Sequence, residues 1–198
     1  MRTTVISATV AVITTLITLK APQAYDRLKR MIDPPPAAAA GFWQTPTIQG
    51  YGPIHTEANS AFHPDRGQHY KVVFQIEQGK ITPQKVSHAL DRVARTVNLY
   101  VDSGVPLSQL SFVVAIAGNA TPIVLDNAHY RAIYGVDNPN LPLFRKLREA
   151  GVTVTVCDQA VAGHRYPFGW VDSSVTRALS SLVTITTLEH QGYTLMPL

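Results

Sequence analysis

The sequence predicts an α/β fold with a largely parallel sheet covered on both faces by helices. From residue 70 onward, short β-rich apolar runs alternate with helical stretches of about ten residues or more, which is the order of βαβ units. The apolar runs lack the polar alternation of a half-solvated strand, so both faces of the sheet should be buried. Of the 198 residues, 45% are apolar and 15% are charged, enough for the core of one domain.

The first βα unit begins with "YKVVFQI" (70–76), a short apolar run typical of a strand buried on both faces. A turn follows in which Thr82 is the expected helix N-cap and Pro83 the first helical residue. Gly104 and then Pro106 should end this helix. Its apolar residues fall on one stripe, formed by Val86, Leu90, Val93, Val97 and Tyr100.

The second unit begins with the strand "LSFVVAIA" (110–117), followed by a tight turn at 118–120 and a helix start at Thr121-Pro122. "IVLDNAHYRAIYG" and "PLFRKLREAG" are expected to be two helices separated by the loop "VDNPN". "VTVTVC" (152–157) is the third strand, and a loop follows it. "VDSSVTRA" suggests a short strand, "LSSLVTITTLEHQ" a helix and "YTLMP" a closing strand.

The N-terminal segment, residues 1–24, has the pattern of an export signal. Arg2 supplies a positive charge, and "TVISATVAVITTLITL" is apolar but too short and threonine-rich for a comfortable span of about 20 residues. Cleavage is expected after Ala24, and an uncleaved N-terminal membrane anchor is the alternative. Either way, the body of the protein should face an exported compartment, the periplasm.

Residues 25–68 do not have the pattern of a folded core. A Pro/Ala-rich linker, "DPPPAAAAG", leads into a segment rich in Gly, Pro and aromatic residues, "FWQTPTIQGYGPIHTEANSAFHPDRG" (42–67), which we name the aromatic arm. Phe42, Trp43, Tyr51 and Phe62 would be costly to expose, so the arm should lie against its own domain or a neighbouring subunit. The α/β domain itself is expected to occupy residues 69–198.

Composition excludes several classes of function. Outside residues 1–24, 15 basic residues face 13 acidic ones, and no basic stripe is interleaved with aromatics, so a nucleic-acid partner is not expected. The seven histidines form no HExxH motif, and the sequence has neither GxGxxG nor GxxxxGK[ST], so we expect no metal and no cofactor. The single cysteine cannot form an intrachain disulfide.

The candidate site lies where parallel α/β sheets place ligands, outside the carboxyl ends of the strands. "GNATP" follows the second strand and "CDQ" the third. Cys157 is the expected catalytic residue, although a free cysteine also serves as a small buried apolar residue. Asp158 beside it would raise the thiol pKa, whereas nearby cations would lower it. The expected binding residues are Gly118, Asn119, Ala120, Thr121, Gln159, His164 and Arg165.

Over residues 69–198 the chain resembles the DsrE/DsrF-like family of sulfur-metabolism proteins, especially its exported single-domain members. The resemblance is carried by "YKVVFQI", "RVARTVNLYVDSGVP", "VAIAGNATPIVLDN", "YGVDNPNLPLFRKLREAGVTVTVC" and "ALSSLVTITTLEHQGYTLMP". It implies a three-layer α/β/α domain, assembly into a homotrimer or larger homo-oligomer, and a persulfide-carrying cysteine at Cys157 with Arg165 as a nearby basic residue. This chain departs from the family in having Asp158 where relatives have glycine, and the well-studied relays are cytoplasmic with partner subunits.

Two functions are therefore expected. The first is a periplasmic sulfur-carrier or thiol-transfer protein that uses Cys157 as its persulfide acceptor, with a sulfur donor and acceptor that the sequence does not identify. The alternative is a non-catalytic homo-oligomeric binding or assembly module in which Cys157 is structural. Solvent access distinguishes them, because an open crevice at the sulfur favours transfer and a sulfur buried under the aromatic arm favours the module.

Overall fold

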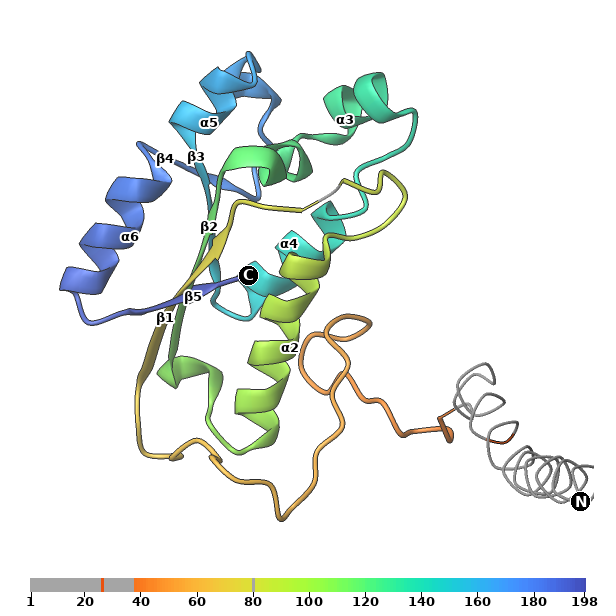
Figure 1. The fold of residues 1–198 in the computed structure, drawn as a ribbon, viewed down its shortest axis with the longest axis vertical. Helices are drawn as coiled ribbons and strands as arrows, with labels where there is room; N and C mark the ends of the chain where they lie inside the picture. Colours follow the sequence, from red (N-terminus) through yellow and green to blue (C-terminus); the bar gives the residue numbers. More distant parts are fainter. Residues whose placement is uncertain (1–25, 27–37, 80) are drawn as a thin grey trace, which may run out of the picture. The chain divides into compact units, whose positions relative to one another are not determined.

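The core of the protein is a sheet of five parallel strands in the order β4-β3-β2-β1-β5 (Figure 1). The strands are β1 (Tyr70–Ile76), β2 (Leu110–Ile116), β3 (Thr153–Cys157), β4 (Thr176–Ala178) and β5 (Thr194–Pro197). This computed structural model describes residue 26 and residues 38–198 except residue 80. The predicted signal sequence and most of the linker lie outside these residues. The predicted α/β class is confirmed.

Strand pairing is longest at the centre of the sheet and short at both edges. β1 and β2 pair along seven residues, from Tyr70 opposite Leu110 to Ile76 opposite Ile116. β4 and β5, the two edge strands, have three and four residues. β5 is the last strand in the sequence, yet it pairs with β1, the first. The chain therefore builds the sheet outward from β1 in one direction and then returns to its other side.

Helices cover the two faces of the sheet unequally. α2 and α4 pack on one face, where their buried residues join those of β1, β2 and β3, and α6 packs on the other through Ile185 (Figure 1). α3 and α5 lie near the carboxyl ends of the strands. The α-helices are α2 (His88–Asp102), α3 (Asn127–Tyr134), α4 (Leu141–Glu149), α5 (Asp158–Gly163) and α6 (Ser181–His190), and the 3-10 helices are η1 (Leu107–Gln109), η2 (Gly118–Val124) and η3 (Phe168–Trp170).

Alternation along the strands gives each face its own core. Phe74 of β1 and Phe112 of β2 point to the α2/α4 face, where their rings meet edge to face with centroids 5.3 Å apart. Their neighbours Val73 and Val113 point to the opposite face and pack near Ile185 of α6. Both faces of the central strands are thus dry, which explains why the strand sequences are continuous apolar runs.

The first helix, α2, begins later than Thr82-Pro83, the start that the sequence predicts. Residues after Thr82 form a turn, in which the Lys85 N–H donates to the Thr82 carbonyl (2.9 Å). Ser87 is the actual N-cap, and its hydroxyl accepts a hydrogen bond from the N–H of Leu90 (3.4 Å). A threonine-proline pair is compatible with a turn as well as a helix start, so tertiary contacts decide between them.

The helix predicted from Thr121-Pro122 is also different in the structure. Thr121 lies inside the 3-10 helix η2, and α3 begins only at Asn127. Asp126 is its N-cap, accepting a hydrogen bond from the His129 N–H (2.9 Å). In addition, the loop expected after β3 contains a short helix, α5, that starts immediately after Cys157. This helix was missed because its six residues are too few to show a helical period.

Part of the aromatic arm packs on α2 of its own chain, whereas Phe42, Trp43 and Phe62, which were expected to be covered, are exposed. Asn98, fully buried in α2, accepts hydrogen bonds from the N–H groups of Thr47 (3.2 Å) and Ile48 (2.7 Å) and donates to the carbonyls of Tyr51 (3.0 Å) and Gly52 (2.9 Å). A Cβ on Gly52 would lie 2.1 Å from the Arg95 nitrogen, so only glycine fits there. Of the two locations expected for the arm, residues 44–54 occupy the intrachain one.

Candidate functional site

Cys157 lies at the carboxyl end of β3, directly before α5. Val154 and Val156 point into the core beneath α2 and α4, so Cys157, one residue further, points to the opposite face, toward the start of α6. The residue is 6% exposed. The sulfur is thus buried, under the start of α6 rather than under the aromatic arm, and it does not line an open crevice.

Hydrogen-bond donors surround the Cys157 sulfur. Burial works to raise the pKa of the thiol, but the N–H groups of Ser181, Ala160 and Gln159 and the hydroxyl of Ser180 act as donors that lower it, and the net result is a pKa below the ordinary value. Such donors favour the charged form of a thiol because they stabilise the anion more than the neutral group. These donors therefore oppose the effect of burial on the thiol pKa.

The start of α6 reaches the sulfur because of strand pairing. Cys157 and Ala178 are opposite each other in the parallel pair β3–β4, so the chain leaving β4 emerges beside the end of β3. Ser180 then caps α6, accepting a hydrogen bond from the Leu182 N–H (3.2 Å), and its hydroxyl is one of the groups that lower the pKa of Cys157. Gln159 reinforces this arrangement from α5, donating its side-chain amide to the Leu179 carbonyl (3.2 Å).

The acidic neighbour of the cysteine is bound by an arginine that the sequence analysis did not single out. Both oxygens of the Asp158 carboxylate accept hydrogen bonds from Arg177 of β4, from Nε and Nη2, each at 2.8 Å. The guanidinium of Arg177 also lies 3.9 Å from the centroid of the Phe168 ring. The charge that was expected to oppose a thiolate is therefore compensated by a two-point ion pair.

The predicted binding loop after β2 contributes none of the groups that lower the pKa of Cys157. Ala120 belongs to the core on the α2/α4 face, opposite the face to which Cys157 points. Its N–H donates to the Glu77 carbonyl (3.3 Å), and the hydroxyl of Thr121 donates to the Gly118 carbonyl (2.7 Å). Gly118 approaches the chain closely, since a Cβ there would lie 2.8 Å from the Glu77 oxygen. Asn119, between them, is exposed.

His164 and Arg165 follow α5, and neither is among the groups that shift the pKa of Cys157. His164 Nε2 lies 2.9 Å from the Gly118 carbonyl oxygen and ties the end of α5 to η2. Arg165 is exposed and has a φ of 59°, in the left-handed region. Of the predicted site residues, Gln159 is among the groups that lower the pKa of Cys157, and 118–121 and Arg165 are not.

The groups that sequence reasoning missed are Ser180, Ser181 and Ala160. A signal for the first two was present, because Ser180-Ser181 precedes an apolar helical run and serine is a common N-cap. Placing them required knowing that β4 lies next to β3, which no local pattern reveals. Ala160 contributes only its backbone N–H, so its side chain gives no clue to its role.

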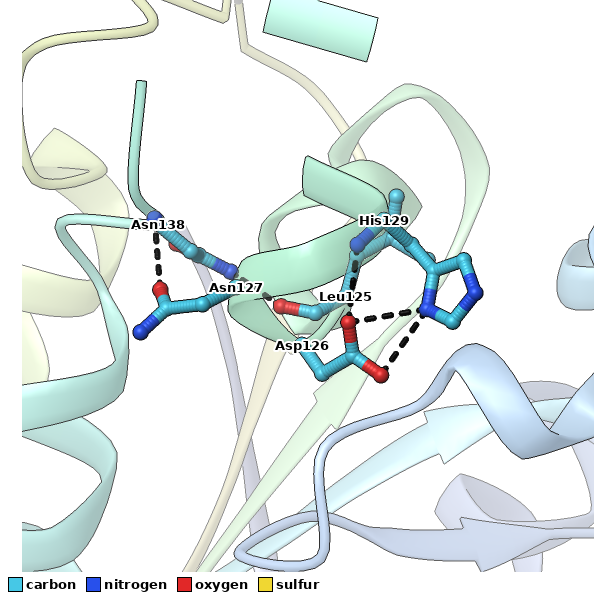
Figure 2. A network of polar contacts seen from close by, with 5 residues as sticks. All are labelled: Leu125, Asp126, Asn127, His129 and Asn138. Carbon is cyan, nitrogen blue, oxygen red and sulfur yellow. Dashed lines mark hydrogen bonds and ion pairs between the residues drawn. The ribbon is translucent and has the colours of Figure 1, made fainter. Parts of the chain in front are cut away.

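A second polar cluster fixes the chain between η2 and α4 (Figure 2). Asp126 contacts the His129 Nδ1 through both carboxylate oxygens (2.8 and 2.9 Å). Burial works to raise the pKa of Asp126, but its hydrogen bonds with His129 and the N–H of Ala128 bring it below the usual value. Asn138, also buried, donates to the Leu125 carbonyl (2.6 Å). The cluster is explained by loop and helix-cap geometry.

Neither a metal site nor a membrane span is found in the described part of the chain. No group of three or more His, Cys, Asp or Glu residues there could hold a metal ion. Among residues 26 and 38–198 without residue 80, no helix combines the length and apolar character needed to cross a bilayer.

Comparison with known proteins identifies no family for this chain. No protein-family model matches it, and no curated protein is significantly similar. Among solved structures, it is similar to MTH1491, a protein of unknown function from Methanobacterium thermoautotrophicum, with 14% sequence identity and a TM-score of 0.46. The match covers 65% of this chain and 99% of the other. What the chain does must therefore be inferred from its own residues.

Proposed function

We propose that this protein is a periplasmic sulfur carrier in which the Cys157 thiolate accepts a sulfane sulfur and passes it on. The observation that carries the proposal is the set of four donors on the sulfur, three backbone N–H groups and the Ser180 hydroxyl, which lower the pKa of a buried thiol. A cysteine that only fills space needs no such donors, because a neutral thiol is a weak hydrogen-bonding group.

The proposed loading step transfers one sulfur atom between thiols. The Cys157 thiolate attacks the outer sulfur of a donor persulfide, R–S–SH. A new S–S bond forms on Cys157 while the S–S bond of the donor breaks, and the donor leaves as the thiolate R–S⁻. A donor environment that stabilises a thiolate also stabilises the negative charge of the loaded persulfide. Unloading is the same exchange with an acceptor thiol.

Access to the sulfur is expected along the start of α6. Cys157 is 6% exposed and Ser181 5%, but Leu179, the residue before Ser180 in the link from β4 to α6, is 68% exposed. Because Ser180 and Ser181 are the first turn of α6, a small displacement of that turn would uncover the sulfur. First turns of helices open more easily than their centres.

The test is persulfide formation on the folded protein. The chain is incubated with a small persulfide such as glutathione persulfide and then weighed intact by mass spectrometry. We expect a gain of one sulfur atom that maps to Cys157, is reversed by a thiol reductant and is absent from Cys157→Ser. If the wild-type protein gains no sulfur while its urea-unfolded form does, the folded site is closed and the carrier function is rejected.

A second candidate function is a non-catalytic binding or assembly module with a structural cysteine. The low exposure of Cys157 favours it, since a fully working thiol would be expected at an open surface. In that case Cys157→Ser should leave self-association and ligand binding unchanged, and native Cys157 should resist alkylation. The two functions thus make opposite predictions for the same pair of measurements.

We also propose that the chain self-associates through α6, as a homotrimer or larger homo-oligomer. Helix α6 is apolar on more than one side, and besides Leu182, Val183 is 48% exposed. An all-round apolar helix usually has protein on both sides. Leu182→Lys should therefore lower the mass measured by light scattering, whereas Ile133→Lys on α3, which is also exposed, should not. An unchanged mass for Leu182→Lys would contradict an α6 interface.

The periplasmic location is proposed from the sequence of residues 1–24. Its test is the full-length chain expressed in a Gram-negative cell, followed by osmotic-shock fractionation and N-terminal mass determination. Release of a product beginning near Tyr25 would support a cleaved signal, and full-length protein in the membrane fraction would support the anchor. Full-length protein in the cytosol would contradict both.

A further inference from the structure

A pocket of about 600 Å³ lies at the carboxyl ends of β1 and β5, separate from the Cys157 site. Its walls include Gln78, just after β1, and Leu198, just after β5. The chain leaves β1 for the face covered by α2, whereas it enters β5 from the face covered by α6. Parallel α/β sheets bind ligands outside the carboxyl ends of their strands, and this pocket lies at that edge.

The pocket combines an apolar interior with a rim that carries a lysine and a histidine. Ile123, Val86 and Ile81 supply aliphatic walls, and Lys85 and His88 are exposed at its edge. Lys85 carries a full positive charge, and an imidazole can donate a hydrogen bond to an anion.

One acidic residue, Asp91, also lines the pocket. Its Oδ1 already accepts a hydrogen bond from the Gly52 N–H (2.7 Å), which directs part of the carboxylate toward the aromatic arm. An anion that enters at the rim would therefore meet Lys85, while Asp91 is engaged on the side of the aromatic arm.

Contacts from buried residues hold the pocket wall in place. Asn140, 1% exposed at the start of α4, accepts a hydrogen bond from the Ser87 N–H (2.7 Å). The hydroxyl of Tyr130, whose ring is buried in α3, donates to the Pro83 carbonyl (3.3 Å). The segment between β1 and α2 is thus pinned to two other helices. Preformed pockets of about 300–1,000 Å³ with an apolar lining and a few placed polar groups are typical of small-molecule sites.

We propose that this pocket binds a small organic anion with an aliphatic body, such as a medium-chain carboxylate. The chain of the ligand would lie along Ile123 and Val86, and its carboxylate would face Lys85 and His88. This function is independent of the sulfur chemistry proposed for Cys157, because the pocket includes Ala120 of the α2/α4 face and Cys157 points to the other.

The test is calorimetric titration of the full chain with octanoate, using 1-octanol as the uncharged probe of equal length. We expect saturable binding of octanoate and weaker binding of octanol. Lys85→Gln should weaken octanoate about threefold to fivefold, the range for a partly exposed ion pair, and leave octanol unchanged. Arg92→Gln, which removes an exposed cation of α2 outside the pocket, is the matched control and should change neither.

A second variant tests the location of the ligand. Ala89 is half-buried in the pocket wall, and its replacement by tryptophan should abolish octanoate binding. Circular dichroism checks that this variant is folded. Cys157→Ser should bind octanoate like the wild type. Any of three results would overturn the proposal. They are no saturable binding at millimolar octanoate, undiminished octanoate binding by a folded Ala89→Trp protein, and an equal loss of octanoate and octanol binding in Lys85→Gln.

Discussion

Replacing Ser180 by alanine tests the thiolate site most directly. The substitution removes the only side-chain donor among the four groups bonded to the Cys157 sulfur. A hydrogen bond to a charged group contributes about 1.5 kcal/mol, so its loss should raise the thiol pKa by about one unit. At a pH below the pKa, the fraction of Cys157 present as thiolate should then fall about tenfold. A more basic thiolate is more nucleophilic, with a Brønsted slope of about 0.4–0.5, so each remaining thiolate should react about threefold faster. The expected net loss of alkylation rate is about threefold.

The assay is the rate of iodoacetamide alkylation of the folded protein, followed by intact mass across a pH series. Wild type should react at a lower pH than Ser180→Ala, and Ser180→Thr, which keeps the hydroxyl, should react like wild type. Ser87→Ala is the matched control, because it removes the corresponding cap of α2 without touching the sulfur. An unchanged rate profile in a folded Ser180→Ala protein, or an equal change in Ser87→Ala, would refute the reasoning.

Three further predictions concern stability. Cys157→Ala should lower the free energy of unfolding, measured in urea, by more at alkaline than at neutral pH. The reason is that the pKa of this thiol is lower in the folded protein than in the unfolded chain. Its ionisation therefore contributes stability that is complete above the unfolded pKa of about 8.5 and is lost as the pH falls through the folded value. Asn98→Leu removes four hydrogen bonds that contribute about 1 kcal/mol each, so the free energy of unfolding should fall by about 3–4 kcal/mol. Limited proteolysis of this variant should begin in residues 44–60. The control is Thr96→Ala on the same helix, which should change neither the free energy of unfolding nor the site of proteolysis. Asp126→Ala should lower the free energy of unfolding by about 1 kcal/mol, because it removes the N-cap of α3. The pKa of Asp126 is lowered in the folded protein, so its ionisation contributes fully to stability only above the unfolded pKa of about 3.9. The difference between wild type and variant should therefore shrink as acid protonates Asp126. If the loss of unfolding free energy in Cys157→Ala or Asp126→Ala did not depend on pH, the charged form of that residue would not be the one that stabilises the fold.

The sheet was predictable from sequence because its strands are buried on both sides. The run 70–76 is β1 to the residue, and "VTVTVC" and "YTLMP" contain β3 and β5. Helix starts were harder. Thr82-Pro83 and Thr121-Pro122 have the residues of a cap followed by a first turn, but the structure uses Ser87 and Asp126 instead. The choice depends on long-range contacts, such as the bond from the Ser87 N–H to Asn140, which a local pattern does not contain.

The candidate site was predicted only in Cys157 and Gln159. Cys157 was found because it ends an apolar strand, and strand ends of parallel sheets share one edge. Its donors come from α5, which is too short to leave a periodic signal, and from α6, which arrives through the pairing of β4 with β3. The loop 118–121 was expected at the sulfur because it occupies the same edge. Which face of the sheet a loop serves depends on alternation along the strand, and Cys157 points away from Ala120.

The position of β5 has a consequence for how the protein is made. One edge of β1 pairs with β5, the last strand of the sheet along the sequence, so a nascent chain leaves that edge open until residues 194–197 have been made. Unpaired edges of apolar strands are templates for aggregation. We therefore expect the nascent chain to depend on chaperones until β5 has been made, and removal of residues 194–198 to lower the fraction of the protein recovered in soluble form.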